Sequence, residues 1–192
     1  MFSNERLGST SWNGREHKRL FWNDGAGRFT DVAFGMGLDV EEDGRAAIFF
    51  DMDGDGDLDL LLTTMDDNHQ VRLFRNEMGS AKHWLKVLPV GITSNRQAVG
   101  SLIRVWAGGK LMVRPVVAGQ GYESSYCGPI HFGLGENAEA DRVEVVFPDG
   151  KSVALTSVRS DQTVTVYQNG YTEAISSPAM PLVFQVDKKG GQ

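Results

Sequence analysis

The 192-residue chain contains a single cysteine, Cys127, so it can form no internal disulfide. It also lacks any run of about 18 consecutive apolar residues, and we therefore expect no transmembrane segment. The opening residues, MFSNERLGS, do not contain the apolar core of a signal peptide. The 19 lysines and arginines are scattered, so we expect no nucleic-acid partner. The lone cysteine is interpreted as a small buried residue and not as a nucleophile.

The most informative stretch that is present is DMDGDGDLDL, residues 51–60. It places an aspartate at every second position, namely Asp51, Asp53, Asp55, Asp57 and Asp59. Carboxylates this close repel one another, and a hard divalent cation removes the repulsion. Calcium prefers carboxylate and carbonyl oxygens, which calcium loops supply at alternate positions around a glycine. We therefore predict one calcium ion as the cofactor of this loop.

The predicted ligands follow from their positions in the loop. Asp51, Asp53, Asp55 and Asp59 would supply side-chain oxygens, Asp57 would supply its backbone carbonyl, and Gly56 would permit the sharp turn. An EF-hand carries a glutamate at the twelfth position, where this chain has Leu62. The stretch is therefore not an EF-hand. The remaining alternative is an acidic turn without a metal.

Short apolar runs flank the aspartates on both sides, at 46–50 and 58–63, and both are typical of strands. Three more strands are expected at 19–23, 29–33 and 71–76, the first two joined by the turn DGAG. The pentapeptide LFWND recurs as LFRNE about 50 positions later, a period typical of propeller blades.

The segment 19–77 resembles the FG-GAP/VCBS repeat of calcium-binding β-propellers, of the kind found in integrin α chains. In that family a blade has four strands, and the calcium loop lies between the first two. The resemblance implies that this chain holds the last two strands of one blade and the first three of the next.

Residues beyond 80 show a different pattern, with short strands separated by turns rich in glycine, asparagine and aspartate. The expected strands are 84–90, 102–106, 111–117, 130–132, 142–147, 152–155 and 163–167. Seven such strands without a helical stretch predict a β-sandwich. The ends, 1–18 and 169–192, are expected to be an irregular arm and a mostly irregular tail, with 182–184 as a candidate strand.

A second resemblance rests on several short motifs that keep their order along the chain. They are HWLKV (83–87), SNR (94–96), GQGY (119–122), HFGLG (131–135), VEVVFPDG (143–150) and DQT (161–163). Together they resemble the ASPIC/UnbV domain over residues 83–168. This domain follows FG-GAP repeats in the cartilage acidic protein-like family, so the chain resembles the C-terminal part of such a protein. The expected fold class is all-β, with partial β-propeller blades and a calcium loop followed by a β-sandwich-like domain.

The resemblance implies a calcium-binding adhesion or scaffold module of an extracellular or cell-surface protein, and not an enzyme. Its partner would be an unknown protein or a glycan. One alternative is an enzyme or accessory protein of a bacterial natural-product pathway, because UnbV-type domains also occur there. Another is a carbohydrate-binding module, because exposed aromatic side chains such as Trp12 and Trp22 can bind sugars. Incomplete blades would also leave strand edges through which the chain could self-associate.

Two further residues are candidates for a functional site. His131 follows Ser124 and Ser125, but no acid is placed beside it and no G-x-S-x-G elbow exists, so a structural histidine is favoured. Arg96 could hold a carboxylate ligand, although we favour a role in bracing its turn. Trp84 and Trp106 are expected in the core.

Overall fold

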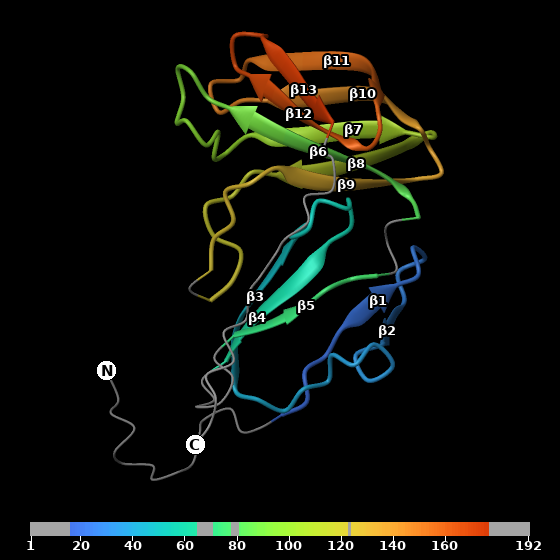
Figure 1. Ribbon diagram of the computed structural model, residues 1–192. Helices are drawn as coiled ribbons and strands as arrows, with labels where there is room; N and C mark the ends of the chain where they lie inside the picture. Colours follow the sequence, from blue (N-terminus) through green and yellow to red (C-terminus); the bar gives the residue numbers. More distant parts are fainter. Residues whose placement is uncertain (1–15, 65–70, 78–80, 123, 177–192) are drawn as a thin grey trace, which may run out of the picture. The chain divides into compact units, whose positions relative to one another are not determined.

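The computed structural model describes residues 16–64, 71–77, 81–122 and 124–176 (Figure 1). These residues form thirteen β-strands and no helix, which confirms the all-β class. Consistent with this, no described segment is a helix long and apolar enough to cross a membrane. The described residues divide into two compact units. One holds the residues up to 47 together with 61–73, and the other holds 48–60 together with those from 74 onward.

The first unit contains the predicted hairpin. Strands β1 (Phe21–Asn23) and β2 (Phe29–Asp31) pair antiparallel, with Trp22 opposite Thr30. The turn between them is held by Asp24, whose carboxylate accepts hydrogen bonds from the Ala26 amide (2.7 Å) and the Arg28 side chain (2.6 Å). Both strands are shorter than the sequence predicted, because β1 begins two residues later and β2 ends two residues earlier.

The next three strands are β3 (Gly44–Phe50), β4 (Asp59–Thr64) and β5 (Val71–Phe74), which form a sheet in the order β3-β4-β5. A two-stranded and a three-stranded sheet thus reproduce the predicted strand count of the two partial blades. The ends of β3 and β4 that adjoin the aspartate stretch, from Ile48 and up to Leu60, belong to the second unit.

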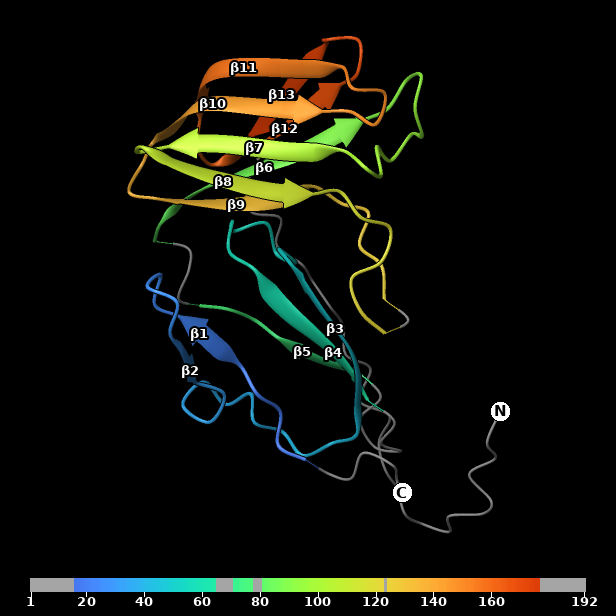
Figure 2. The same ribbon diagram turned by 180° about the vertical axis from the view of Figure 1, so that it is seen from behind.

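The second unit is built around two four-stranded sheets, drawn as stacked layers in Figures 1 and 2. One sheet has the order β11-β10-β7-β8 and the other the order β13-β12-β6-β9. The strands of these two sheets are β6 (His83–Val90), β7 (Leu102–Ala107), β8 (Lys110–Pro115), β9 (Ile130–Gly135), β10 (Glu139–Val146), β11 (Ser152–Arg159), β12 (Gln162–Tyr167) and β13 (Thr172–Ser176). β6 and β12 pair parallel, whereas the other paired strands of the two sheets are antiparallel.

The hydrophobic core lies between these two sheets. Alternate residues of β7 and β10, such as Val105 and Val145, are fully buried, and so are Leu85 and Val87 on β6. Phe132 of β9 and Phe147 are the largest fully buried side chains. Such period-two burial is what a sandwich requires, because successive side chains of a strand point to opposite faces. The predicted β-sandwich is therefore confirmed.

The structure also differs from the sequence expectations. β13, at Thr172–Ser176, lies in the part predicted as an irregular tail, and it pairs with β12. Cys127 is exposed, so its prediction as a buried residue was wrong. Trp84 is buried as expected, while Trp106 is half-buried. Trp12 and the candidate strand 182–184 lie outside the described residues. The domain boundaries at 19–77 and 83–168 stay predictions.

Candidate metal centre

The aspartate stretch forms the connection between β3 and β4. Asp51, Asp53 and Asp59 each bring one carboxylate oxygen to a common point, where the three oxygens lie within 4.8 Å of one another. Three of the four predicted carboxylate ligands thus converge, although they are separated along the chain. Oxygens at this spacing could hold a metal ion.

Asp59, the first residue of β4, ties together two parts of the site. It is fully buried, and its carboxylate accepts hydrogen bonds from the amides of Met52 (2.8 Å) and Asn76 (2.9 Å). The first bond closes the loop on itself, and the second joins it to the residues that follow β5. A buried carboxylate with two amide donors is a fixed element of the site.

Asp51 is the second anchor. Its two oxygens accept hydrogen bonds from the amides of Gly54 (2.6 Å) and Gly56 (2.9 Å), so the loop wraps around this carboxylate. The ammonium group of Lys86, on β6, forms an ion pair with Asp51. Both side chains are nearly shielded from water, and the Lys86 ammonium also lies 4.5 Å from the centroid of the Trp84 ring. The sandwich therefore supplies one positive charge to the acidic loop.

Asp55 and Asp57 lie beside the converging carboxylates. Asp55 accepts a hydrogen bond from the Asp57 amide (3.0 Å). Burial raises the pKa of Asp55, and the charges of Asp53, Asp51 and Asp59 raise it further, against the lowering effect of that hydrogen bond. The effects of the three neighbouring charges, each smaller than that of burial, are the mutual repulsion that the alternating spacing predicts. A bound cation would relieve it, because it stabilises every ionised carboxylate around it.

The tip of the loop contacts strands β6 and β9 of the sandwich. Gly56 has a φ of 99°, and a Cβ built on it would lie 1.7 Å from Nε1 of Trp84. The Gly56 carbonyl accepts a hydrogen bond from Nε2 of His131 (2.8 Å), whose ring stacks on Trp84 at 6.4 Å between centroids. Only a residue without a side chain allows this approach.

His131 has a structural position in this arrangement. A carbonyl oxygen can only accept, so Nε2 of His131 carries the hydrogen. Burial lowers the pKa of His131, which favours the neutral imidazole. The histidine thus holds the loop tip through a neutral hydrogen bond, in line with the structural role favoured from the sequence.

Lys86 and Trp84 were not identified from the sequence as part of this site. Both contact the loop from a strand about 30 residues away along the chain, a relation that only the fold creates. The alternating pattern of residues 84–90 did mark β6 as a strand, and Lys86, the one charged residue in that run, was the available signal. A buried lysine needs an acidic partner, because an unpaired buried charge is costly.

Comparison with known families matches both halves of the chain. Residues 9–62 match the FG-GAP-like repeat, and residues 91–173 match the ASPIC and UnbV family. The chain carries both motifs, in that order. The resemblances inferred from the short motifs are therefore confirmed.

The FG-GAP-like match contains the whole aspartate loop, while His131 lies within the ASPIC and UnbV match. Among curated relatives, the chain is 34% identical to cartilage acidic protein 1 of Mus musculus over 149 residues, which are 72% of this chain and 21% of that protein. It is 35% identical to the same-named protein of Homo sapiens over 130 residues, 62% of this chain and 18% of the relative. The chain thus spans about a fifth of the length of these relatives.

Proposed function

We propose that the chain is a calcium-binding interaction module in which calcium is a structural ion. The main support for this proposal is that the carboxylate oxygens of Asp51, Asp53 and Asp59 lie within 4.8 Å of one another. The donor set is made of oxygens alone, which suits calcium better than softer metals that select nitrogen or sulfur. Asp55 and the Asp57 carbonyl would complete the coordination as the sequence predicted.

A structural role is favoured over a catalytic one by how the carboxylates are used. Asp51 and Asp59 already fold the loop through four amide hydrogen bonds, so a cation there would fix the connection between β3 and β4. The alternative of an enzyme or accessory protein of a natural-product pathway would be supported by an activity in a substrate screen. We infer no such activity from the carboxylates themselves.

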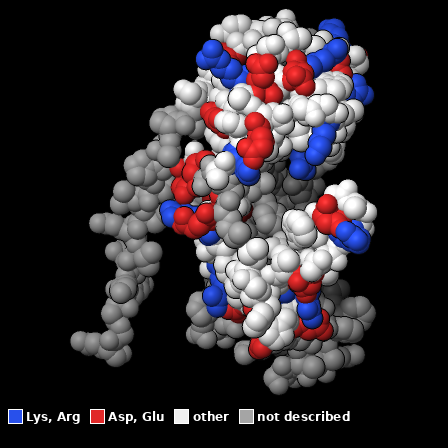
Figure 3. Space-filling model, turned by 90° about the vertical axis from the view of Figure 1, so that its right-hand side faces the viewer, with Lys and Arg blue, Asp and Glu red and all other residues white. Residues whose placement is uncertain are grey.

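An extracellular or cell-surface location is part of the proposal. It draws on the similarity to proteins named cartilage acidic protein 1. Extracellular calcium modules work at about 0.1 to 1 mM calcium, an affinity range suited to one partly exposed loop. On the face shown in Figure 3, lysine and arginine side chains lie among acidic ones, which gives no support to a nucleic-acid surface. A protein or glycan partner remains the better proposal.

Calcium is expected to raise the melting temperature of the chain. With a dissociation constant near 0.1 mM, about 10 mM calcium would stabilise the native state by about 2.7 kcal/mol. For a chain of this size that corresponds to roughly 5 to 10 °C. Differential scanning fluorimetry in calcium, in magnesium and in chelator would measure it. Equal melting temperatures in calcium and chelator would contradict the proposal.

Lys86→Met is the informative variant in the same experiment. In chelator it should melt lower than the wild type, because Asp51 loses its counter-charge. In calcium its affinity for the ion should rise by at least about tenfold, since a positive charge beside the site repels the ion. The matched control is Lys82→Met, which removes an exposed ion pair with Glu136 and should change neither value.

We also propose that the chain self-associates through its partial blades. The first unit leaves large apolar side chains exposed, with Phe21 58%, Trp22 60% and Phe29 64% accessible. Among the described residues, β1 and β2 pair only with each other. A two-stranded hairpin is marginal by itself, and strand edges without a partner can pair with another chain. Light scattering should therefore show a concentration-dependent mass that Trp22→Glu reduces. A constant monomer, with slow hydrogen exchange in β1 and β2, would contradict this.

A further inference from the structure

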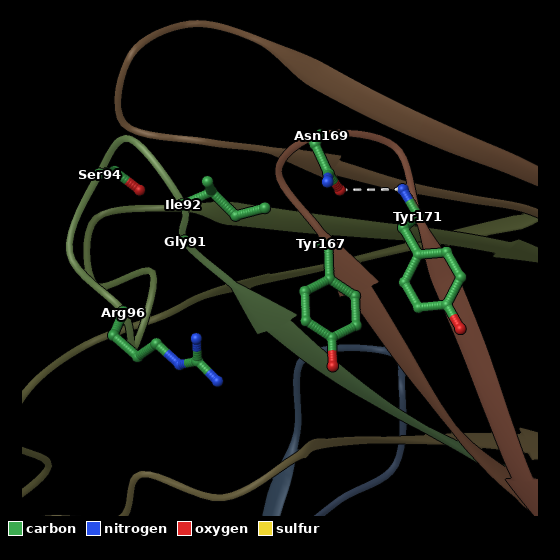
Figure 4. Close-up of a pocket in the computed structure, with 7 residues that line it drawn as sticks. All are labelled: Gly91, Ile92, Ser94, Arg96, Tyr167, Asn169 and Tyr171. Carbon is green, nitrogen blue, oxygen red and sulfur yellow. Dashed lines mark hydrogen bonds between the residues drawn. The ribbon is translucent and has the colours of Figure 1, made fainter.

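A pocket of about 550 Å³ lies on the sandwich, well apart in sequence from the aspartate loop. It opens between the loop after β6 and the turn that joins β12 to β13 (Figure 4). The residues that line it are Gly91, Ile92, Ser94, Arg96, Tyr167, Asn169 and Tyr171. Its volume falls in the range of small-molecule sites.

One wall of the pocket is a loop held in a single conformation by Gln168. The buried side-chain oxygen of Gln168 accepts hydrogen bonds from the amides of Ile92 (2.8 Å), Thr93 (2.9 Å) and Ser94 (3.0 Å). The Gly91 amide closes the loop by donating to the carbonyl of Arg96 (3.1 Å). The loop is therefore preorganised, and a ligand would not have to order it.

Arg96 offers an available positive charge at one side of this pocket. Its side chain is exposed, and within the described part of the chain it makes no ion pair or hydrogen bond. In Figure 4 the guanidinium extends from the loop toward Tyr167. A guanidinium presents several N–H donors in a fork that matches a carboxylate. The expectation that the Arg96 side chain braces its turn is therefore wrong for the described residues, where only its backbone carbonyl closes the loop.

The opposite wall is a pair of tyrosines. The rings of Tyr167 and Tyr171 lie 5.4 Å apart between centroids at 47°, and Tyr171 is 57% exposed. Their hydroxyl ends are directed to Glu173: Tyr167 donates to it at 3.5 Å, and a hydrogen bond to Glu173 raises the pKa of Tyr171. The exposed ring surfaces, together with Ile92, remain for a ligand. Aromatic faces of this kind stack on flat or apolar groups.

We propose that this pocket binds an acidic saccharide, that is, a pyranose ring carrying a carboxylate. The carboxylate would pair with Arg96, and the C–H face of the sugar would stack on Tyr171. Asn169 Oδ1 accepts from the Tyr171 amide (3.1 Å) and the Ser94 hydroxyl donates to Gln168 (3.2 Å), so the sugar hydroxyls would meet the N–H groups of Asn169 and the oxygen of Ser94. A small inorganic anion would leave the tyrosine pair unused, and a neutral sugar would leave Arg96 unpaired. This inference deepens the proposed interaction role, yet it uses none of the residues of the metal centre.

The test is a titration with digalacturonate, followed by NMR on the wild-type chain, with cellobiose as the uncharged comparison. Digalacturonate is expected to bind and to shift the resonances of Ile92 and Tyr171, while cellobiose binds at least about tenfold more weakly, since a bidentate charged pair is lost. Arg96→Ala should reduce digalacturonate affinity by about tenfold or more. Tyr171→Ala should reduce the affinity for both sugars.

Two control variants sharpen this test. Arg159→Ala removes an exposed arginine of the same sandwich that does not line the pocket, and it should bind like the wild type. Glu173→Gln removes the negative charge beside the tyrosines and should tighten digalacturonate binding without changing that of cellobiose. Thermal melts would show that each variant is folded.

The inference is overturned if the two sugars bind equally, if Arg96→Ala binds like the wild type, or if acetate binds as tightly as digalacturonate. A peptide with a free C-terminal carboxylate that binds more tightly than the disaccharide would likewise replace it with a peptide site. Each titration is run both with calcium and with chelator. Because sugar binding should occur in both, a failure of the calcium proposal and a failure of this inference give different results.

Discussion

Gly56→Ala is expected to destabilise the second unit by about 3 kcal/mol and to detach the aspartate loop from the sheet beneath it. The φ of 99° is strained for any residue with a Cβ, at a cost of roughly 1 to 2 kcal/mol. The added Cβ would also lie 1.7 Å from Nε1 of the buried Trp84, which cannot move aside without breaking its stacking on His131. Urea unfolding followed by Trp fluorescence would measure the loss.

A matched control separates the cost of backbone strain from the cost of losing the contact between the aspartate loop and Trp84. Gly150→Ala sits at a similar φ of 83°, and its Cβ would meet nothing within 4 Å. It should therefore cost only the strain of about 1 kcal/mol. If Gly56→Ala and Gly150→Ala lose the same free energy of unfolding, then the contact with Trp84 does not hold the aspartate loop in place.

Asp59→Ala is expected to have a comparably large effect. It removes the acceptor of two amides, Met52 and Asn76, at a fully buried position. Each unsatisfied buried donor costs about 1 to 3 kcal/mol, so the loss should reach roughly 3 kcal/mol in chelator. Calcium should no longer stabilise this variant, because one converging carboxylate is gone. Thermal melts with and without calcium would measure both effects.

Asp59→Asn distinguishes the two roles of this residue. The amide keeps an acceptor oxygen, so much of the stability in chelator should return. It removes the charge, however, and calcium stabilisation should remain weak. Asp141→Ala, which removes an exposed carboxylate on the sandwich, should behave like the wild type in both conditions. Full calcium stabilisation of Asp59→Asn would contradict the assignment of Asp59 as a ligand.

Local patterns explain what could be predicted from the sequence. The strands of the sandwich alternate apolar and polar residues, as in 142–147. Such alternation indicates a half-buried strand even when the strand that pairs with it is unknown. The three residues Asp51, Asp53 and Asp59 likewise lie within ten residues of one another, and their spacing predicts a loop whose carboxylates converge. β13 was missed because Thr172–Ser176 is almost wholly exposed, so its pairing with β12 leaves no alternating pattern in the sequence.

What could not be predicted depends on contacts between distant residues. Nothing local shows that Lys86 would reach Asp51, or that Trp84 would lie against Gly56. The grouping of residues 48–60 with the sandwich is of the same kind, because residues 48–50 and 59–60 belong to strands β3 and β4 of the three-stranded sheet. The error at Cys127 has a related cause, since burial was inferred from the residue type and not from a place in a strand.

Isothermal titration of the folded wild-type chain with calcium tests the proposed metal centre most directly. We predict one calcium ion per chain, with a dissociation constant of about 0.1 to 1 mM and much weaker binding of magnesium, which demands a tighter octahedral site. A folded chain that takes up no calcium at about 10 mM would contradict the proposal that Asp51, Asp53 and Asp59 converge to hold this ion.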